Sequence, residues 1–296
     1  MEACGSAHYW ARRFQSAGHQ VKLIAPQYVK PFVIGNKSDR IDAKAIAEVA
    51  VRASTPSVAV KSDEHLDLQA IHRVRERLVR SRTAVCNEIR GLLFEHGICL
   101  SQGMRALRLA IAGISDGSLY PELSQSCRIT VTDLYEELLD TDDRIKRNEQ
   151  RLEHFAKDSE ACQRLQSIPG IGLITATALV AATPNPGCFK NGRQFAAWIG
   201  LVPRHSGTGG AHKNKLGRIS KRGDPYLRRL LVHGGRAAIQ YVDRRDDAAA
   251  QWIRRLKDKK GWNRACVALA NKNARVAWAL LNSNATYDSK KVSKAS

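Results

Sequence analysis

The segment Val21-Lys22-Leu23-Ile24-Ala25 predicts a β-strand that ends at Pro26. A helix is expected before this strand, over His8–Ala17, and a second helix after it, from about Asp39 to Arg52. A helix, a strand and a helix within about fifty residues are typical of an α/β domain. Because one strand cannot form a sheet alone, these residues predict only part of such a domain.

Two carboxylates lie close together in the stretch Lys37-Ser38-Asp39-Arg40-Ile41-Asp42-Ala43. On a helix, Asp39 and Asp42 are three positions apart and project from one face. Mg²⁺ is a common partner for such a pair, because it binds one or two carboxylates together with phosphate oxygens. A two-metal phosphodiester enzyme needs acids of this kind from separate elements. The alternative is an exposed helix start, where acids are favoured by the helix dipole.

The chain is strongly basic, with 296 residues, a net charge of +20 and a pI of about 10.0. Residues 190–260 hold 18 Lys or Arg against 5 Asp or Glu, which places +13 of the charge in one stretch. A solvated face is the ordinary reason for a charge run, but this density favours a nucleic-acid partner. The length is enough for two domains, and the hydrophobic content of 43% is enough for a packed core.

The seven cysteines are scattered and never form a C-x-x-C pair. Neither a zinc site nor a disulfide framework is therefore predicted, and a reduced cytosol fits. No apolar run reaches membrane-spanning length, and no signal peptide is recognised. We predict a cytoplasmic, nucleoid-associated protein without a membrane partner.

The middle of the chain predicts two long amphipathic helices. Apolar residues recur near helical spacing over Lys61–His96 and again over Val131–Phe155, with a short helix expected at Met104–Ile111 between them. Two such helices joined by a loop predict an antiparallel hairpin, and a coiled coil is one form that such a hairpin takes. The spacing alone fits an ordinary bundle core as well as it fits a dimerisation arm.

A tight turn, Ile168-Pro169-Gly170-Ile171-Gly172, leads into the Ala/Thr-rich run Leu173–Ala182. This pattern is typical of a helix-hairpin-helix, in which Gly170 and Gly172 let backbone N–H groups approach a phosphate. A helix–helix turn without any ligand is the alternative.

Residues 204–224 combine glycines, hydroxyls and cations with almost nothing to bury, and predict an active-site or DNA-contact loop. Its side chains and backbone donors could surround a phosphate. The expected phosphate contacts are Arg204, Lys213, Lys215, Arg218, Lys221 and Arg222. Helices are expected from Pro225 and again over Ala265–Leu281, before a polar, disordered tail.

Several of these segments resemble the DEDD insertion-sequence transposases of the IS110 family. Met1-Glu2-Ala3-Cys4-Gly5 and the stretch 37–43 resemble the family's two acidic elements. Ile168–Gly172, Phe195–Pro203 and Gly217–Asp224 resemble, in order, its C-terminal transposase domain. Ala268–Lys272 and Ala277–Leu281 resemble the IS1111 subgroup.

The resemblance implies an α/β plus all-α fold. It comprises a partial RuvC-like, RNase-H-type domain at 1–56, a helical coiled-coil region at 57–160, a mainly helical transposase domain with a helix-hairpin-helix at 161–284, and a tail at 285–296. It implies that Glu2, Asp39 and Asp42 bind Mg²⁺ as the second, third and fourth acids of the catalytic set. It also implies a nucleophilic serine, for which Ser206 is preferred because it opens the loop beside Arg204. Thr208 and Ser220 are alternatives, and all these hydroxyls could instead only bind phosphate.

The implied function is transposition: cleaving and rejoining DNA at element ends and target under the guidance of a structured RNA, by a homo-oligomer. One departure bears on activity, because the family's first acid lies on a strand upstream of the Glu2 element and has no counterpart here. A truncated, impaired enzyme is therefore expected. The alternatives are a non-enzymatic DNA- or RNA-binding fragment and a RuvC-like junction nuclease.

Overall fold

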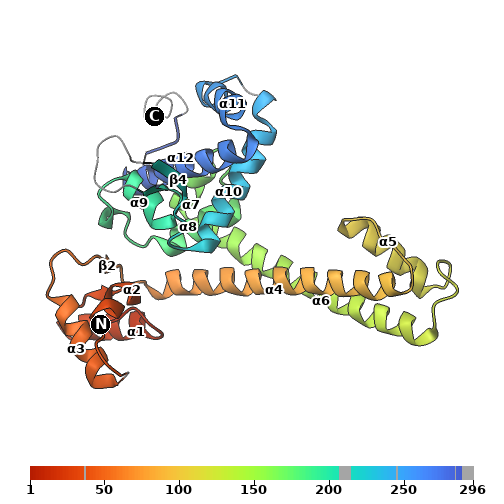
Figure 1. Ribbon diagram of the computed structural model, residues 1–296, viewed down its shortest axis with the longest axis horizontal. Coiled ribbons are helices and arrows are strands. Elements are labelled where there is room, and N and C mark those ends of the chain that lie inside the picture. The colour runs from red at the N-terminus through yellow and green to blue at the C-terminus, as the bar shows by residue number, and fades with distance from the viewer. Residues whose placement is uncertain (37, 207–214, 245, 284, 289–296) are drawn as a thin grey trace. The chain divides into compact units, whose positions relative to one another are not determined.

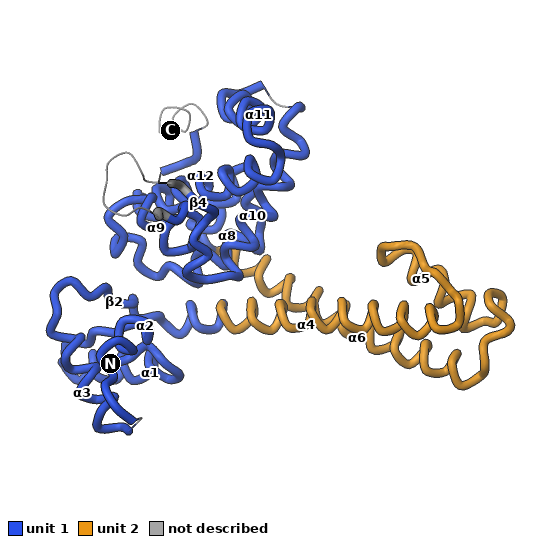
Figure 2. The backbone as a smooth tube through the Cα atoms, viewed as in Figure 1, with its two compact units in different colours: residues 1–68, 159–296 blue, residues 69–158 orange. Residues whose placement is uncertain are grey.

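The computed structural model describes residues 1–36, 38–206, 215–244, 246–283 and 285–288, with His205, Ser206, Lys215 and Leu216 described by their backbone only. The chain is mostly helical and divides into two compact units, residues 1–68 with 159–296 and residues 69–158 (Figure 2). Within the described ranges, no helix combines the length and the apolar character that a membrane crossing requires.

The N-terminal residues form a small mixed sheet with helices around it (Figure 1). The elements are α1 (Ala7–Ser16), β1 (Leu23–Ile24), α2 (Pro26–Val29), the 3₁₀ helix η1 (Lys30–Phe32), α3 (Asp39–Ala50) and β2 (Ser57–Val58). β1 pairs antiparallel with β2 through Leu23 and Val58, while Glu2 forms a parallel bridge to Ile24. The predicted strand is thus present, but it is only two residues long.

The two residues of β1 serve opposite faces of this sheet, as the alternation of a strand requires. Leu23 is buried with Ala7 and Ala11 of α1. Ile24 is buried with Ala45 and Val49 of α3. The helices that the sequence predicts on either side of the strand therefore cover one face each.

The second unit is a helical hairpin. Its helices are α4 (Asp63–Glu95, which begins in the first unit), α5 (Met104–Ser115) and α6 (Gln125–Asp158). Two ion pairs join α4 to α6: Arg75 to Glu149 at 2.6 Å and Arg82 to Asp142 at 3.2 Å. A step of seven residues forward on α4 matches seven residues back on α6, so the helices are antiparallel. The predicted hairpin is present, and its supercoiling stays a prediction.

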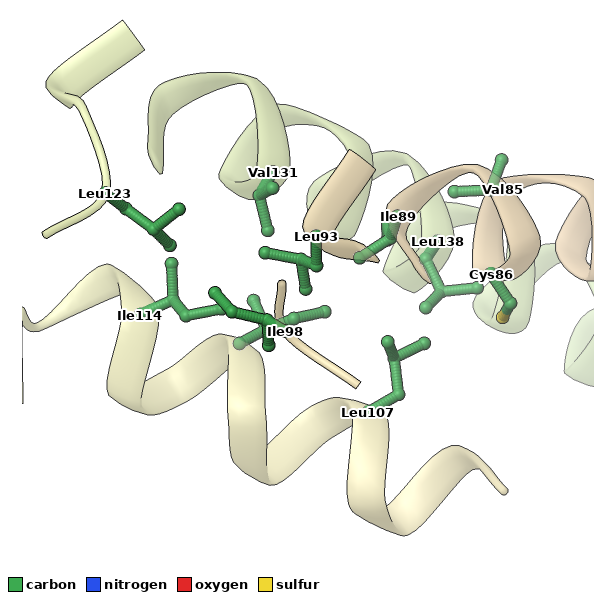
Figure 3. Close-up of a cluster of buried hydrophobic side chains, with 11 residues drawn as sticks. Val85, Cys86, Ile89, Leu93, Ile98, Leu107, Ile114, Leu123, Val131 and Leu138 are labelled. Atoms are coloured by element: carbon green, nitrogen blue, oxygen red, sulfur yellow. The ribbon is translucent and has the colours of Figure 1, made fainter. Parts of the chain in front are cut away.

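The end of this hairpin is closed by a hydrophobic core to which three helices contribute (Figure 3). Ile89 and Leu93 of α4 point toward Leu107 of α5 and Val131 of α6, and all four are buried. The connection into α6 is held by Arg128, whose guanidinium donates to the carbonyls of Leu123, Ile114 and Tyr120 at 3.2, 2.6 and 2.6 Å.

The C-terminal part of the first unit consists of helices and one β-hairpin. Its elements are α7 (Glu160–Gln166), α8 (Leu173–Ala182), η2 (Pro186–Cys188), α9 (Gly192–Ile199), β3 (Pro203–Ser206), β4 (Lys215–Ile219), α10 (Pro225–Gln240), η3 (Val242–Arg244), α11 (Ala248–Lys260) and α12 (Trp262–Ser283). α8 coincides with the predicted helix. The stretch 204–224, predicted as a loop throughout, instead contains β3 and β4, because its ends pair with each other through backbone hydrogen bonds that no apolar alternation signals.

α10 contacts its neighbours at two adjacent glycines. An added Cβ at Gly234 would lie 1.8 Å from the carbonyl oxygen of Gly170, and one at Gly235 would lie 2.7 Å from that of Cys266 in α12. Gly170 itself has φ +90°, which favours glycine. The Pro169–Gly170 turn and α12 therefore approach α10 more closely than any side chain would permit.

Candidate functional site

The β3–β4 hairpin carries the preferred nucleophile, Ser206. Its register pairs Pro203 with Ile219 and Ser206 with Lys215, with an irregularity between Pro203 and His205. Ser206 is therefore the last residue of β3, at the end away from the base of the hairpin. Thr208 and Lys213, the other predicted residues of this loop, lie outside the described residues.

The base of the hairpin is fixed against the C-terminal end of α9. The N–H of Ser220 donates to Val202 at 2.7 Å, and that of Lys221 donates to Gly200 at 3.1 Å. An added Cβ at Gly200 would lie 2.0 Å from the carbonyl oxygen of Arg222, and one at Gly223 would lie 1.8 Å from that of Trp198. Backbone contact this close leaves the turn 220–223 little freedom to shift.

Four of the predicted phosphate contacts gather at this hairpin and its turn, and all four are exposed: Arg204, Arg218, Lys221 and Arg222. Among the described residues none of them joins an ion pair with an acid. The neighbouring carboxylate, Asp224, caps α10 instead, accepting from the N–H groups of Tyr226 and Leu227 at 2.7 and 3.3 Å. The surface is therefore cationic, as a phosphate site requires.

Ser220 lies at the base of the same hairpin and is half-buried. Its carbonyl accepts from Arg204 at 3.2 Å, and its hydroxyl accepts from the N–H of Arg222 at 3.4 Å. These bonds give Ser220 a part in shaping the turn. Ser206 is three residues further along the strand from Pro203, or roughly 10 Å at the usual rise of a strand, so the two serines occupy different ends of the hairpin.

The α7–turn–α8 segment presents its two glycines differently. Gly170 packs on Gly234 of α10, so its lack of a side chain is already required inside the molecule. Gly172 is exposed at the first position before α8, and an added Cβ there would meet nothing within 4 Å. Phosphate binding by this turn stays a prediction, with Gly172 as its accessible residue.

Of the three predicted metal ligands, Glu2 forms the bridge to β1, and Asp39 and Asp42 belong to α3. Met1 and Ala3 pack with the α1 cluster, so strand alternation directs Glu2 to the opposite face, which α3 covers. Asp39 and Asp42 are in the first turn of α3, which Ser38 caps by accepting from the N–H of Ile41 at 3.3 Å. The described residues nevertheless contain no group of three His, Cys, Asp or Glu side chains close enough to hold a metal. As placed, these acids do not form a complete Mg²⁺ site.

α12 supplies contacts that the sequence reasoning missed. Asn273 donates to the carbonyl of Pro169 at 2.9 Å, Asn271 to that of Leu201 at 3.1 Å, and Trp278 to that of Pro186 at 2.9 Å. One helix thus fastens the α7–α8 turn, the segment before the hairpin and the segment before α9. The signal was Asn273, which follows the apolar spacing of the helix although it is an amide, and a buried amide needs a partner.

Sequence comparisons agree over both ends of the chain. A family model described as Transposase IS116/IS110/IS902 family matches residues 162–251, and a DEDD transposase model of the IS110 type matches residues 1–97.

Several transposases align with 97% of this chain, including three from different organisms. "Probable family 20 transposase" of Pseudomonas aeruginosa is 47% identical, with 84% of its length covered. "Transposase for insertion sequence element IS1111A" of Coxiella burnetii is 46% identical, with 78% covered. "Transposase for insertion sequence element IS1328" of Yersinia enterocolitica is 38% identical, with 84% covered.

A basic, mainly helical chain with these relatives is an insertion-sequence transposase by class. The chain belongs to the IS110/IS116 transposase family, and the resemblance drawn from its motifs is confirmed.

Proposed function

We propose that the chain cleaves and rejoins DNA strands during transposition, with Ser206 as the nucleophile. The observation that supports this most is the β3–β4 hairpin, whose first strand ends at Ser206 and which carries the exposed Arg204 and Arg218. DNA is the polyanion that a transposase acts on, and the net charge of +20 suits it.

In this proposal the serine oxygen forms a bond to a backbone phosphorus while one P–O ester bond breaks. The serine proton is lost to a base, and the departing sugar oxygen takes up a proton. The DNA is then held covalently, and attack by a sugar hydroxyl reverses the step and rejoins a strand. Arg204 and Arg218 would stabilise the charge that develops on the phosphate oxygens.

Mg²⁺ is assigned no step, because Glu2, Asp39 and Asp42 do not gather into a metal group. Carboxylates are ligands that Mg²⁺ prefers, so the binding of Mg²⁺ to these residues is tested separately from DNA cleavage. Calorimetric titration of the full chain with Mg²⁺, beside the Asp42→Asn variant, should give the same weak signal for both. Saturable binding that Asp42→Asn removes would restore the acids as ligands.

A structured guide RNA and a homo-oligomer complete the proposal, on the strength of family membership. The RNA transcribed from the element should bind the full chain more tightly than a shuffled RNA of equal length. Equal affinities would remove the guide from the proposal. Sedimentation of the complex would give the oligomeric state.

The nucleophile is tested with duplex DNA that carries the element's own ends, together with the element's RNA. The unaltered chain and Ser220→Ala should form a protein–DNA adduct that survives denaturation, and Ser206→Ala should form none. An adduct that persists in Ser206→Ala but disappears in Ser220→Ala would move the role to Ser220.

A second candidate is DNA or RNA binding without cleavage, favoured because the three acids do not form a metal group among the described residues. It predicts no adduct from any variant, together with binding that weakens steeply as salt rises. Strand transfer by the unaltered chain would exclude it.

A further inference from the structure

The exposed face of α10 differs in character from the face it buries. Leu227, Leu231 and Ile239 are buried. On the other side, Arg229, His233 and Arg236 follow one another at steps of four and three residues and are all exposed. That spacing places them on one face of the helix. The residues of this face follow the β3–β4 hairpin in the sequence and are not part of it.

Three arginines on and beside this face are each laid over an aromatic ring. The guanidinium carbon of Arg229 is 5.4 Å from the ring centre of Tyr226, that of Arg236 is 5.1 Å from Trp262, and that of Arg244 is 5.1 Å from Tyr241. The set of Arg229, Arg236 and Arg244 with their rings is called the arginine strip below. A ring under a guanidinium limits its rotamers while leaving its N–H edge available.

The charge of this region is almost entirely positive. Residues 225–244 contain four arginines and one carboxylate, Asp243. That carboxylate faces Arg254 at 4.0 Å and Lys257 at 3.7 Å, both from α11. Within the described part of the chain, Arg236 and Arg244 have no ion pair with an acid. Their charge is therefore left for a partner.

We propose that the arginine strip is a docking surface for the phosphate backbone of duplex DNA, separate from the Ser206 hairpin. This inference rests on the proposed function, in that the partner is the DNA of the element. An arginine held flat by a ring is suited to bidentate phosphate contact. From Arg229 to Arg236 the helix rises about 10 Å, which matches roughly three base steps of a duplex. The rings act as supports for the arginines, so paired bases need not open.

The test uses the full chain and a fluorescent duplex carrying the element's ends, with affinity measured by anisotropy from low to physiological salt. The variant is Arg236→Gln with Arg244→Gln. The matched control, Arg80→Gln with Arg144→Gln, removes the same charge from exposed arginines of α4 and α6. We expect the strip variant to lose about tenfold or more in affinity, and its salt slope to fall by about two, since each phosphate contact contributes about 0.9. For the control variant, the change in the salt slope and the change in the binding free energy should each be less than half of those expected for the strip variant.

The supporting role of the ring is tested by Trp262→Leu, with circular dichroism to check that the helices are retained. It should weaken binding several-fold at an unchanged salt slope, because the arginines remain. If the strip variant and the control lose affinity equally, the effect is net charge and the docking surface is wrong. If affinity falls only for the element's RNA, the surface belongs to RNA and the DNA proposal is wrong. If the unaltered chain shows no salt-dependent DNA binding, the proposed function itself fails.

Discussion

Replacing Gly234 by alanine tests the close contact between α10 and the Pro169–Gly170 turn. The new Cβ would lie 1.8 Å from the carbonyl oxygen of Gly170, well under the 3.0 Å that real Cβ contacts respect, so the turn must move. Overpacking of this kind costs about 1–3 kcal/mol. Displacing the turn also weakens its bond from Asn273, worth about 1 kcal/mol. Alanine is more favourable than glycine inside a helix, which offsets about 0.5–1 kcal/mol of this cost. The net expectation is a loss of about 1–3.5 kcal/mol in the free energy of unfolding.

Urea denaturation followed by circular dichroism measures this difference. The matched control is Gly91→Ala in α4, where glycine is exposed and the added Cβ meets nothing within 4 Å. The free energy of unfolding of that variant should rise by about 0.5–1 kcal/mol, because alanine has a higher helix propensity than glycine. The same substitution thus has opposite signs at two helical positions. A neutral or stabilised Gly234→Ala variant would refute the close approach on which the reasoning depends.

Three further outcomes can be measured. Asn273→Ala should lower stability by about 1–3 kcal/mol in thermal unfolding, because it leaves the half-buried carbonyl of Pro169 without its donor; an unchanged midpoint would contradict this role. Gly223→Ala should weaken DNA binding as well as stability, since its Cβ would meet the carbonyl oxygen of Trp198 at 1.8 Å and displace the cationic turn; intact affinity would show that the turn is not used. Burial, with a smaller effect from Arg75, lowers the pKa of His72 to about 4, so the unfolded chain binds a proton that the folded chain does not. Between pH 7 and pH 4 the free energy of unfolding of the unaltered chain should therefore fall by about 3 kcal/mol more than that of His72→Leu. Equal changes in the free energy of unfolding of both chains, measured by urea denaturation at each pH, would contradict this.

The helices could be predicted from the sequence because their signals are local. The apolar spacing over 61–96 predicts α4, which runs over Asp63–Glu95, and the small-residue run predicts α8 at Leu173–Ala182. Both ends of α6, at Gln125 and Asp158, extend beyond the predicted range 131–155, since packing continues where the pattern weakens. A repeated period within one segment needs no knowledge of its neighbours.

Features that depend on distant partners could not be predicted. The two residues of β1 are a strand only because residues distant in the sequence pair with them, Val58 with Leu23 and both Ser57 and Glu2 with Ile24. The hairpin at 203–219 has no apolar alternation, so its glycines and cations indicated a loop. The need for glycine at Gly170 comes from Gly234, and no local pattern of the turn contains that information.

The candidate site was predictable in its residue types and less so in its assembly. The i, i+3 spacing correctly placed Asp39 and Asp42 in the first turn of one helix. Whether those acids meet Glu2 depends on the sheet and on the angle of α3, which spacing does not encode. For Ser206 and the phosphate contacts, motif order indicated a common segment, and the catalytic assignment stays a prediction.

The position of α12 in the chain has a consequence for the timing of synthesis. The bond from Asn273 to Pro169 spans 104 residues of sequence. At about 5–20 residues per second, a ribosome needs roughly 5–20 s to supply the donor after the acceptor has been made. Until then the α7–α8 turn, the segment before the β3–β4 hairpin and the segment before α9 lack their hydrogen bonds from α12. On a nascent chain these three contacts can therefore form only after α12 has been made, so the C-terminal part completes its hydrogen bonds late in synthesis.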